Sequence, residues 1–306
     1  MPNPSAEPRL AAHELRPDRL FTEWLAVGAG LSVLVVVLVF TGAVLRLDHL
    51  LYDYVAAARP LPMPDEIVII GIDEASLARI GPWPWPRRIH AQALDRINAA
   101  GARAIAYDVL FTEPAADDAV LERALARSVP IVLPMQFRVP GSDGRGYDEM
   151  APVVGAGGRA SRLRIGHSSV RPDADGVVRT LDLALDGVRR WPHVAVQVAG
   201  PHPLPAFVPR PAAAPLLRQG ERLIGYRGGP GRFRTIPFAA LIAGEVPPEL
   251  LAGRIVMVGA TAAGLGDQFA TPGAGASGVM PGVEIQANFV ADLLQQRNLR
   301  RAGPGA

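Results

Sequence analysis

The feature that most constrains this chain is an uncharged apolar segment, residues 24–45, bounded by Glu23 and Arg46. At about 1.5 Å per helical residue, such a segment reaches roughly the 30 Å of a bilayer core. A cleaved signal peptide has a shorter apolar region, of about 7 to 15 residues, with small residues close behind it. The Ala-rich candidate for cleavage, residues 56–58, lies well beyond the segment. We therefore predict an uncleaved transmembrane helix.

The distribution of Arg around this predicted helix indicates its orientation. Arg is slightly more frequent in the segment before the helix than in the residues directly after it. Because positively charged flanks tend to stay in the cytoplasm, we expect the N-terminus inside. No later run approaches the eighteen apolar residues of a second span. The predicted organisation is a cytoplasmic segment 1–23, a single-pass helix 24–45 in the inner (cytoplasmic) membrane, and an extracytoplasmic domain 46–306.

Composition excludes several classes of protein. The 31 basic and 29 acidic side chains nearly cancel, and every basic side chain is an Arg, spread along the whole chain. Such a distribution lacks the basic patch of a nucleic-acid binder, so nucleic acid is not an expected partner. The absence of Cys excludes disulfides, thiolate catalysis and thiolate metal sites. At 306 residues and 49% hydrophobic residues, the chain can bury a sizeable core.

From residue 65 onward, β-branched apolar runs alternate with helical patterns, which is typical of βαβ units. We predict strands over 67–72, 104–109, 131–137, 177–185, 222–226 and 254–259, and helices over 88–100, 117–126, 238–243 and 283–296, with a further helix beginning at Pro192. The Gly- and Pro-rich residues 139–158 are expected to form a surface excursion. The fold class that follows is α/β, with a largely parallel or mixed sheet flanked by helices and preceded by one transmembrane helix.

Two carboxylates, Asp73 and Asp108, lie at or near the carboxyl ends of predicted strands, where open α/β sheets usually bind ligands. A paired-carboxylate site is one interpretation. Asp73 also begins a short helical pattern, and Asp is a preferred N-cap residue, so a capping role is favoured for it. For Asp108, a structural hydrogen bond to a neighbouring loop is as good an interpretation as ligand contact.

The segment from Gly81 to Arg87 contains two Trp residues, each followed by Pro, which pushes the Trp backbone toward an extended conformation. The indoles of Trp83 and Trp85 could stack on a ligand, with Arg87 available for an anionic group. Equally, the indoles could cover the edge of the sheet, and that interpretation is favoured.

The segment 259–267 follows a predicted strand and contains Thr261 and Asp267. It lacks the Lys-Ser/Thr pair of a phosphate loop, and residues 173–176 have their Gly too early for a calcium loop and are better explained as a tight turn. The His residues have no metal-ligand spacing, and no nucleophile motif is complete. We predict no catalytic residue, metal site or cofactor. The candidate ligand-binding residues are Asp73, Trp83, Trp85, Arg87, Asp108, Thr261 and Asp267.

A series of ordered motifs runs from residue 65 to residue 299. They are IVIIGIDEASL (67–77), WPWPR (83–87), AIAYDVLF (104–111), DADGVVR (173–179), IVMVGAT (255–261), Asp267, TP (271–272) and MPGVEIQAN (280–288). In this order they resemble the second type of CHASE domain, the "cyclases/histidine kinases associated sensory extracellular" modules of bacterial receptors. One departure is Gln286, at a position where members of the family commonly have His.

The resemblance implies a leading transmembrane helix, a sensor domain outside, three more transmembrane helices, and a cytoplasmic output module such as a nucleotide cyclase, histidine kinase or diguanylate cyclase. The sequence stops at Ala306, where the next membrane helix is expected. We therefore expect a truncated receptor that is not itself an enzyme, because its output enzyme would lie beyond Ala306.

The leading hypothesis is an extracytoplasmic sensory input domain in which an unknown small-molecule or protein stimulus changes the shape of the domain or its pairing in a possible homodimer. One alternative is an extracytoplasmic metal-dependent hydrolase that uses Asp73, Asp108 or Asp267. The other is a non-catalytic assembly protein of the cell envelope, which would need no small ligand.

Overall fold

The structure, a computed structural model, describes residues 17–40, 43–58, 61–138, 147–155, 162–272, 278–297 and 299–300. The chain divides into two compact units, Met1–Tyr52 and Asp53–Ala306.

The first unit contains α1 (Pro17–Phe40) and the beginning of α2 (Ala43–Ala58). Among the described residues, α1 is the helix that is long and apolar enough to cross a membrane, with a mean hydropathy of 2.0 over Phe21–Leu38. Its large apolar side chains are exposed, for example Trp24 at 74%. Because a helix that is apolar on all sides needs an apolar environment, α1 fits a membrane span.

The bounds of α1 differ from the predicted span 24–45. The helix begins at Pro17, because a proline suits the first turn of a helix and charged residues before Trp24 are compatible with helical structure. At the other end, α1 reaches Phe40, and residues 41–42 lie outside the described residues. The apolar pattern did not predict α2, which carries charged residues among its apolar ones.

The second unit is built on a seven-stranded sheet. In spatial order its strands are β11 (Thr235–Pro237), β1 (Ile67–Ile72), β12 (Ile255–Ala260), β2 (Ala104–Tyr107) and β3 (Ile131–Arg138), with β5 (Leu163–His167) and β4 (Asp148–Met150) both paired to β3. Only the pairing of β4 with β3 is antiparallel among the pairs recorded for this sheet. The predicted α/β fold with a largely parallel or mixed sheet is confirmed.

Both faces of this sheet are covered, and β1 shows how. All six residues of β1 are buried. Because side chains alternate across a strand, Ile67 and Ile69 enter one hydrophobic cluster, whereas Val68 and Ile70 enter the other. This explains why the strand is apolar throughout, as expected for a parallel sheet between two helical layers.

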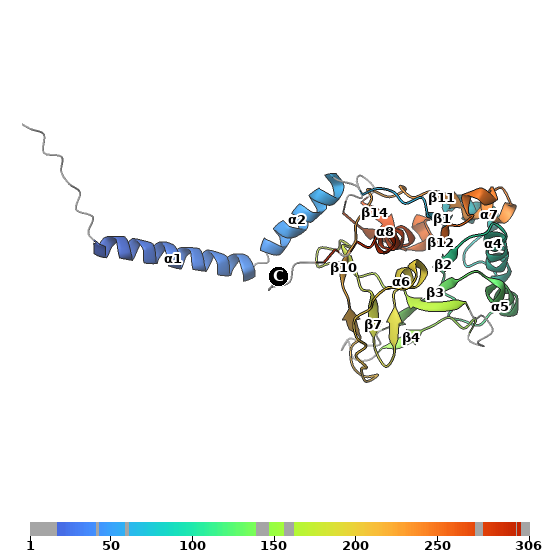
Figure 1. Cartoon of the computed structure of the whole chain (residues 1–306), viewed down its shortest axis with the longest axis horizontal. Helices are drawn as coiled ribbons and strands as arrows, with labels where there is room; N and C mark the ends of the chain where they lie inside the picture. Colours follow the sequence, from blue (N-terminus) through green and yellow to red (C-terminus); the bar gives the residue numbers. More distant parts are fainter. Residues whose placement is uncertain are drawn as a thin grey trace, which may run out of the picture. The chain divides into compact units, whose positions relative to one another are not determined.

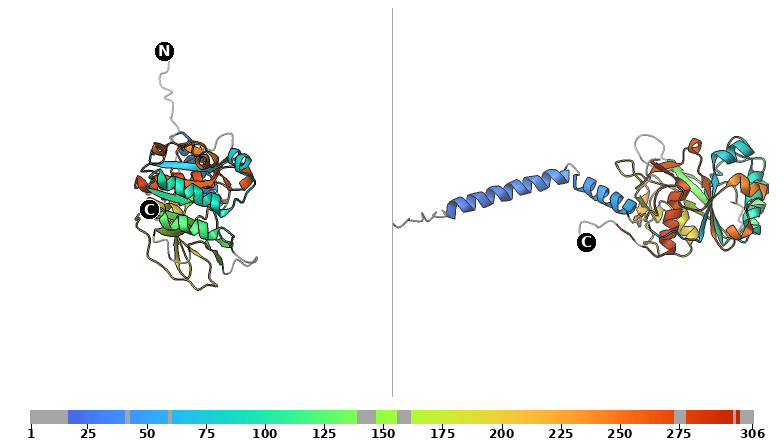
Figure 2. Two further views of the ribbon diagram at one scale, coloured as in Figure 1. Left: turned by 90° about the vertical axis from the view of Figure 1, so that its right-hand side faces the viewer. Right: turned by 90° about the horizontal axis from the view of Figure 1, so that it is seen from above.

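The two helical layers are visible in Figure 1 and in the right-hand view of Figure 2. One layer contains α3 (Glu74–Ile80), α4 (Arg87–Ala99), α5 (Asp118–Arg127) and α7 (Phe238–Ala243). The opposite layer contains α6 (Val194–Ala199) and α8 (Gly282–Leu294). The face of α8 that meets the sheet includes Ile285 and Phe289, both almost completely buried.

Short strands and 3-10 helices complete the second unit. They are the pairs β6 (Thr180–Leu181) with β10 (Arg222–Leu223) and β13 (Gln268–Ala270) with β14 (Val279–Pro281), the sheet β8 (Arg190–Pro192), β7 (Ala184–Asp186), β9 (Leu217–Gln219), and the 3-10 helices η1 (Pro248–Leu250) and η2 (Ala263–Leu265).

Three local predictions needed correction. The expected strand 177–185 is two short strands, β6 and β7. Pro192 ends β8 instead of starting a helix; α6 begins after His193, whose Nδ1 accepts a hydrogen bond from the Ala195 N–H at 3.0 Å. Part of the expected excursion 139–158 lies outside the described residues. Within the described part, β4 joins the sheet and Val154 is buried. The prediction missed this because the local sequence pattern does not indicate the pairing of β4 with β3.

Candidate functional site

A pocket of about 580 Å³ opens at the carboxyl edge of the sheet. We call it the carboxyl-edge pocket. Its described lining residues come from the last residues of β1, β3 and β12, from the segments that follow β1, β2, β5 and β12, and from β13 and α8. They are Ile72, Trp83, Asp108, Val109, Leu110, Gln136, Phe137, Ser168, Ser169, Val170, Ala260, Leu265, Gly266, Asp267, Phe269 and Gln286. This is the edge at which open α/β sheets bind ligands, and the volume lies in the range of small-molecule sites.

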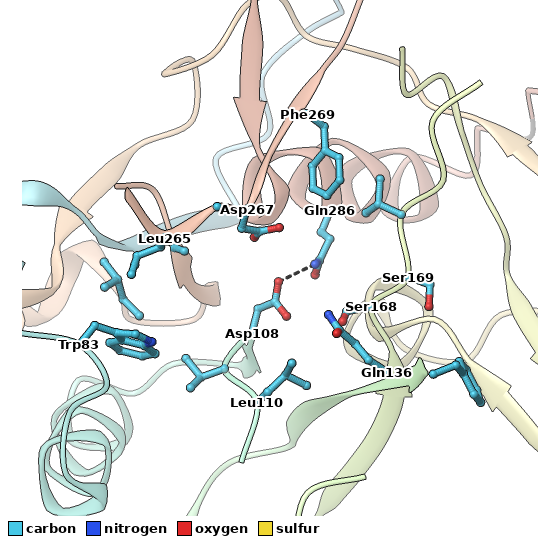
Figure 3. Close-up of a pocket in the computed structure, with 16 residues that line it drawn as sticks. Trp83, Asp108, Leu110, Gln136, Ser168, Ser169, Leu265, Asp267, Phe269 and Gln286 are labelled. Carbon is cyan, nitrogen blue, oxygen red and sulfur yellow. Dashed lines mark hydrogen bonds between the residues drawn. The ribbon is translucent and has the colours of Figure 1, made fainter. Parts of the chain in front are cut away.

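Asp108, Asp267 and Gln286 meet at the centre of this pocket (Figure 3). Asp108 directly follows β2, and its backbone N–H donates to the Val258 carbonyl at 2.7 Å, which holds the residue against β12. Gln286, on α8, donates from Nε2 to Asp108 Oδ2 at 2.6 Å. Gln286 is therefore a direct partner of the Asp108 carboxyl group.

The electrostatics of the two carboxyl groups are unusual. Burial and the nearby charge of Asp267 raise the pKa of Asp108 to about 7, although the hydrogen bond from Gln286 acts in the opposite direction. Burial also raises the pKa of Asp267. A carboxyl group ordinarily loses its proton at a pH well below neutral, so a raised pKa means that the folded protein disfavours the ionised form. A proton or a bound cation would reduce this electrostatic cost.

Two buried polar atoms in the pocket wall have no hydrogen-bond partner among the described residues. Gln286 is 2% exposed, and its Oε1 is unpaired. Ser168 is 7% exposed, and its Oγ is unpaired. Because buried polar atoms are nearly always paired in folded proteins, these two atoms are unsatisfied hydrogen-bonding groups in the pocket wall.

Aromatic rings form the apolar part of the pocket wall. Trp83 lies in the loop between α3 and α4, Phe137 lies near the end of β3, and Phe269 lies in β13. All three side chains are partly exposed, and Figure 3 shows Trp83 and Phe269 on opposite sides of Asp108. The rings offer flat faces on which an apolar or cationic group can pack.

The structure brings together three of the seven candidate residues, Trp83, Asp108 and Asp267, and places the others elsewhere. Asp73 caps α3, accepting the Ser76 N–H at Oδ1 over 2.8 Å. The Oγ1 atom of Thr261 is buried and unpaired but does not line the pocket. It lies 2.7 Å from where a Cβ on Gly71 would be, so it packs against the backbone of β1.

The two indoles of the Trp-Pro segment have different environments. Trp85 is 3% exposed, and its ring centroid lies 4.8 Å from that of Phe238. Its Nε1 donates a hydrogen bond to the Gly81 carbonyl at 2.8 Å. It therefore covers the core, whereas Trp83 lines the pocket. The guanidinium of Arg87 pairs with Asp118 at 3.0 Å, so it is directed to α5 and is not among the residues of the pocket wall.

Sequence reasoning did not select Gln136, Ser168, Ser169, Phe137 or Phe269. Each follows or lies near the end of a strand, but neutral polar and aromatic residues at strand ends are common without a ligand. For Gln286, the one available signal was the expectation of His at that position, which came from the family resemblance.

A second polar cluster surrounds Arg179, whose side chain is 2% exposed. It forms ion pairs with Asp53 at 2.7 Å, with Asp173 at 3.1 Å and with Asp175 at 2.8 Å. Residues 173–176 form the predicted tight turn, closed by a hydrogen bond from the Gly176 N–H to the Asp173 carbonyl at 2.9 Å. We call these four charged residues the Arg179 cluster. It connects the turn to Asp53, within the last part of α2.

Fold and pocket together define a small-molecule-sized site in an α/β domain that follows a candidate membrane helix. The family model of the CHASE2 domain matches residues 31–305, so the chain belongs to the CHASE2 family. CHASE2 domains are extracellular, non-catalytic sensory domains of signalling receptors. Searches among curated proteins and among solved structures found no match to this chain.

Proposed function

We propose that this chain is the sensory input part of a membrane receptor and that its stimulus binds in the carboxyl-edge pocket. In this proposal α1 crosses the cytoplasmic membrane with the N-terminus inside, and the CHASE2 domain lies outside the cytoplasm. The observation that carries the pocket assignment is the pair of unpaired buried atoms, Gln286 Oε1 and Ser168 Oγ, beside two carboxyl groups with raised pKa values.

A sensor must have two states with different affinities for the stimulus. The pocket is suited to this requirement, because its wall combines segments that are far apart in the sequence: the loops after β2 and β12, and α8 with its Gln286. A molecule that contacts all three segments would favour one arrangement of these segments over another. A pocket built from a single loop would lack this property.

The Arg179 cluster offers a route from the domain to the anchor. Arg179 follows the 173–176 turn and lies directly before β6, and it holds Asp53 of α2 through two hydrogen bonds of 2.8 and 2.7 Å. A shift of the Arg179 backbone would therefore act on the end of α2. We propose that this ion-pair cluster is the mechanical link, with a cyclase, histidine kinase or diguanylate cyclase as the receiving output. Pairing of two chains remains a further prediction.

The pocket assignment is tested with the full chain in lipid nanodiscs. Small molecules are screened by thermal shift, because a ligand that binds only the folded form at 100 times its Kd stabilises it by about 2.7 kcal/mol. Hits are then tested against Phe269→Ala in the pocket wall and against Phe207→Ala, a ring that is 43% exposed and outside the pocket. We expect Phe269→Ala to reduce the shift and Phe207→Ala to leave it unchanged. If no molecule gives a shift, or if both variants respond alike, the pocket assignment is wrong.

The orientation is tested separately with an alkaline phosphatase reporter joined after Ala306. The reporter folds to an active enzyme only outside the cytoplasm, so we expect activity. A parallel fusion after Glu23, before the uncharged part of α1, should be inactive. An inactive Ala306 fusion would contradict the proposed orientation.

A further inference from the structure

We infer that the carboxyl-edge pocket takes a small organic amine in its ammonium form, a molecule with a positive N–H-bearing head and an apolar body. This inference rests on the proposed function, because it names the chemical class of the stimulus at the same site.

The charge of the pocket favours a cation. Its described lining contains two carboxyl groups, Asp108 and Asp267, and no Lys, Arg or His. An anionic ligand would meet two like charges without a compensating base. A neutral ligand would leave the repulsion between the carboxyl groups in place. A cation between them favours the ionised form of both, so its binding free energy includes relief of that repulsion.

The hydrogen-bonding groups favour a donor-rich head group. The unpaired Oε1 of Gln286 accepts hydrogen bonds but cannot donate them, and the same is true of ionised carboxylates. Ser168 Oγ, also unpaired, can accept as well. An ammonium group with two or three N–H bonds supplies donors to the carboxylates, and a small shift of the pocket wall would bring the buried Gln286 Oε1 and Ser168 Oγ within its reach. Charge-assisted hydrogen bonds are the stronger kind.

The size and walls of the pocket favour an organic molecule over a bare metal ion. At about 580 Å³, the space exceeds by more than tenfold the roughly 30 Å³ that one water molecule occupies in the liquid. The rings of Trp83, Phe137 and Phe269 are not ligands that a hard divalent cation uses, whereas they can pack on an alkyl or aromatic body and attract an ammonium through their faces.

The test uses matched probes that differ only in the head group. Phenethylammonium is compared with 2-phenylethanol and phenylacetate, and butylammonium with butanol and butyrate, by titration calorimetry on the full chain in nanodiscs. MgCl2 and CaCl2 are titrated alone. We expect at least one ammonium probe to bind about tenfold or more tightly than its alcohol, as a charge-assisted contact in a partly buried site would give.

The variants assign this preference to the pocket. Asp108→Asn and Asp267→Asn each keep the side-chain shape and remove one charge, so we expect each to abolish the ammonium preference. Asp95→Asn is the matched control, because Asp95 is 52% exposed on α4, pairs with Arg127, and lies outside the pocket wall. The preference of Asp95→Asn for the ammonium probe over the alcohol should equal that of the unchanged chain.

The remaining outcomes separate the two proposals. If an alcohol or carboxylate probe binds as tightly as the matching ammonium probe, and Phe269→Ala weakens this binding, the pocket assignment stands and the inference of a cationic ligand is wrong. If Mg²⁺ or Ca²⁺ binds with the same dependence on Asp108 and Asp267 while the ammonium probes do not bind, the site is a metal site and the inference is overturned. If no probe binds in a way that depends on any pocket residue, and the thermal-shift screen also gives no pocket-dependent hit, both the inference and the proposed function fail.

Discussion

Replacing Asp108 by Asn should stabilise the unliganded domain, and the gain should grow with pH. The folded-state pKa of Asp108, about 7, lies above its ordinary value of 3.8. A group with a raised pKa in the folded state favours folding when protonated, and this contribution is lost as pH rises from the unfolded value through the folded one. Above pH 7 the folded chain must therefore hold an unfavourable carboxylate, whereas Asn stays neutral and keeps the shape.

The magnitude follows from the pH range between the two values. Each pH unit between about 4 and 7 changes the difference in the free energy of unfolding between Asp108→Asn and the unchanged protein by about 1.4 kcal/mol. The interval from pH 5 to pH 8 therefore contributes about 2–3 kcal/mol. This pH-dependent part is independent of any constant packing effect of the substitution. Asp267 is the other titratable group in the described pocket lining, and Asp267→Asn should show the same sign, since burial raises its pKa too.

The assay is thermal unfolding of the full chain in nanodiscs at pH 5 and at pH 8, for the unchanged protein, Asp108→Asn and the control Asp95→Asn. We expect Asp108→Asn to gain several degrees relative to the unchanged protein on going from pH 5 to pH 8, and Asp95→Asn to gain nothing. A difference that is the same at both pH values, or that falls as pH rises, would refute the assignment of a raised pKa to Asp108.

Three further predictions concern other parts of the second unit. Arg179→Met should destabilise the domain by about 1–3 kcal/mol in denaturant unfolding, because it removes the buried partner of three carboxylates, two of which, Asp53 and Asp175, are partly exposed and stay hydrated; retention of full stability would contradict the role given to the cluster. Burial lowers the pKa of His193 to about 3, below its ordinary 6.5, so its contribution to stability is present above pH 6.5 and is lost as pH falls. His193→Asn keeps a capping acceptor but does not titrate, and thermal melts between pH 6.5 and pH 5 should show a smaller acid loss in this variant, by up to about 1.4 kcal/mol per pH unit; equal slopes would show that His193 does not carry the effect. Gly282→Ala should weaken binding of any pocket ligand at least tenfold in calorimetry, because its Cβ would lie 2.5 Å from both carboxylate oxygens of Asp267 and displace them; unchanged affinity would place Asp267 outside the binding site.

Much of the fold could be predicted because the signals are local. The run Ile67–Ile72 is β-branched except for Gly71 and forms β1, and the apolar periodicity of residues 283–296 corresponds to α8 at Gly282–Leu294. Pairings between distant segments were not predictable in the same way. β4 joins β3 from a Gly- and Pro-rich region, and Pro192 closes a strand because β7 lies beside it.

The candidate site was predicted in part for the same reason. Asp108 was selected because it lies near the end of a recognisable strand, and Asp73 because it follows another, yet the two have different environments. The Asp73 carboxylate accepts a hydrogen bond from the first turn of α3, a role that the local sequence already favoured. The contact between Asp108 and Gln286 depends on how α8 packs against the sheet, and no pattern within either segment indicates it.

The sequence alone therefore determined the class of fold, the apolar helix and the family, since each depends on the order and periodicity of residues along the chain. Only the tertiary structure decided which carboxyl groups share a pocket. β12 inserts between β1 and β2, although it comes late in the chain. The segment after β12, which carries Asp267, is thereby placed beside Asp108 at the end of β2. That neighbourhood comes from strand order across the sheet, a long-range property that arises only when the core is packed.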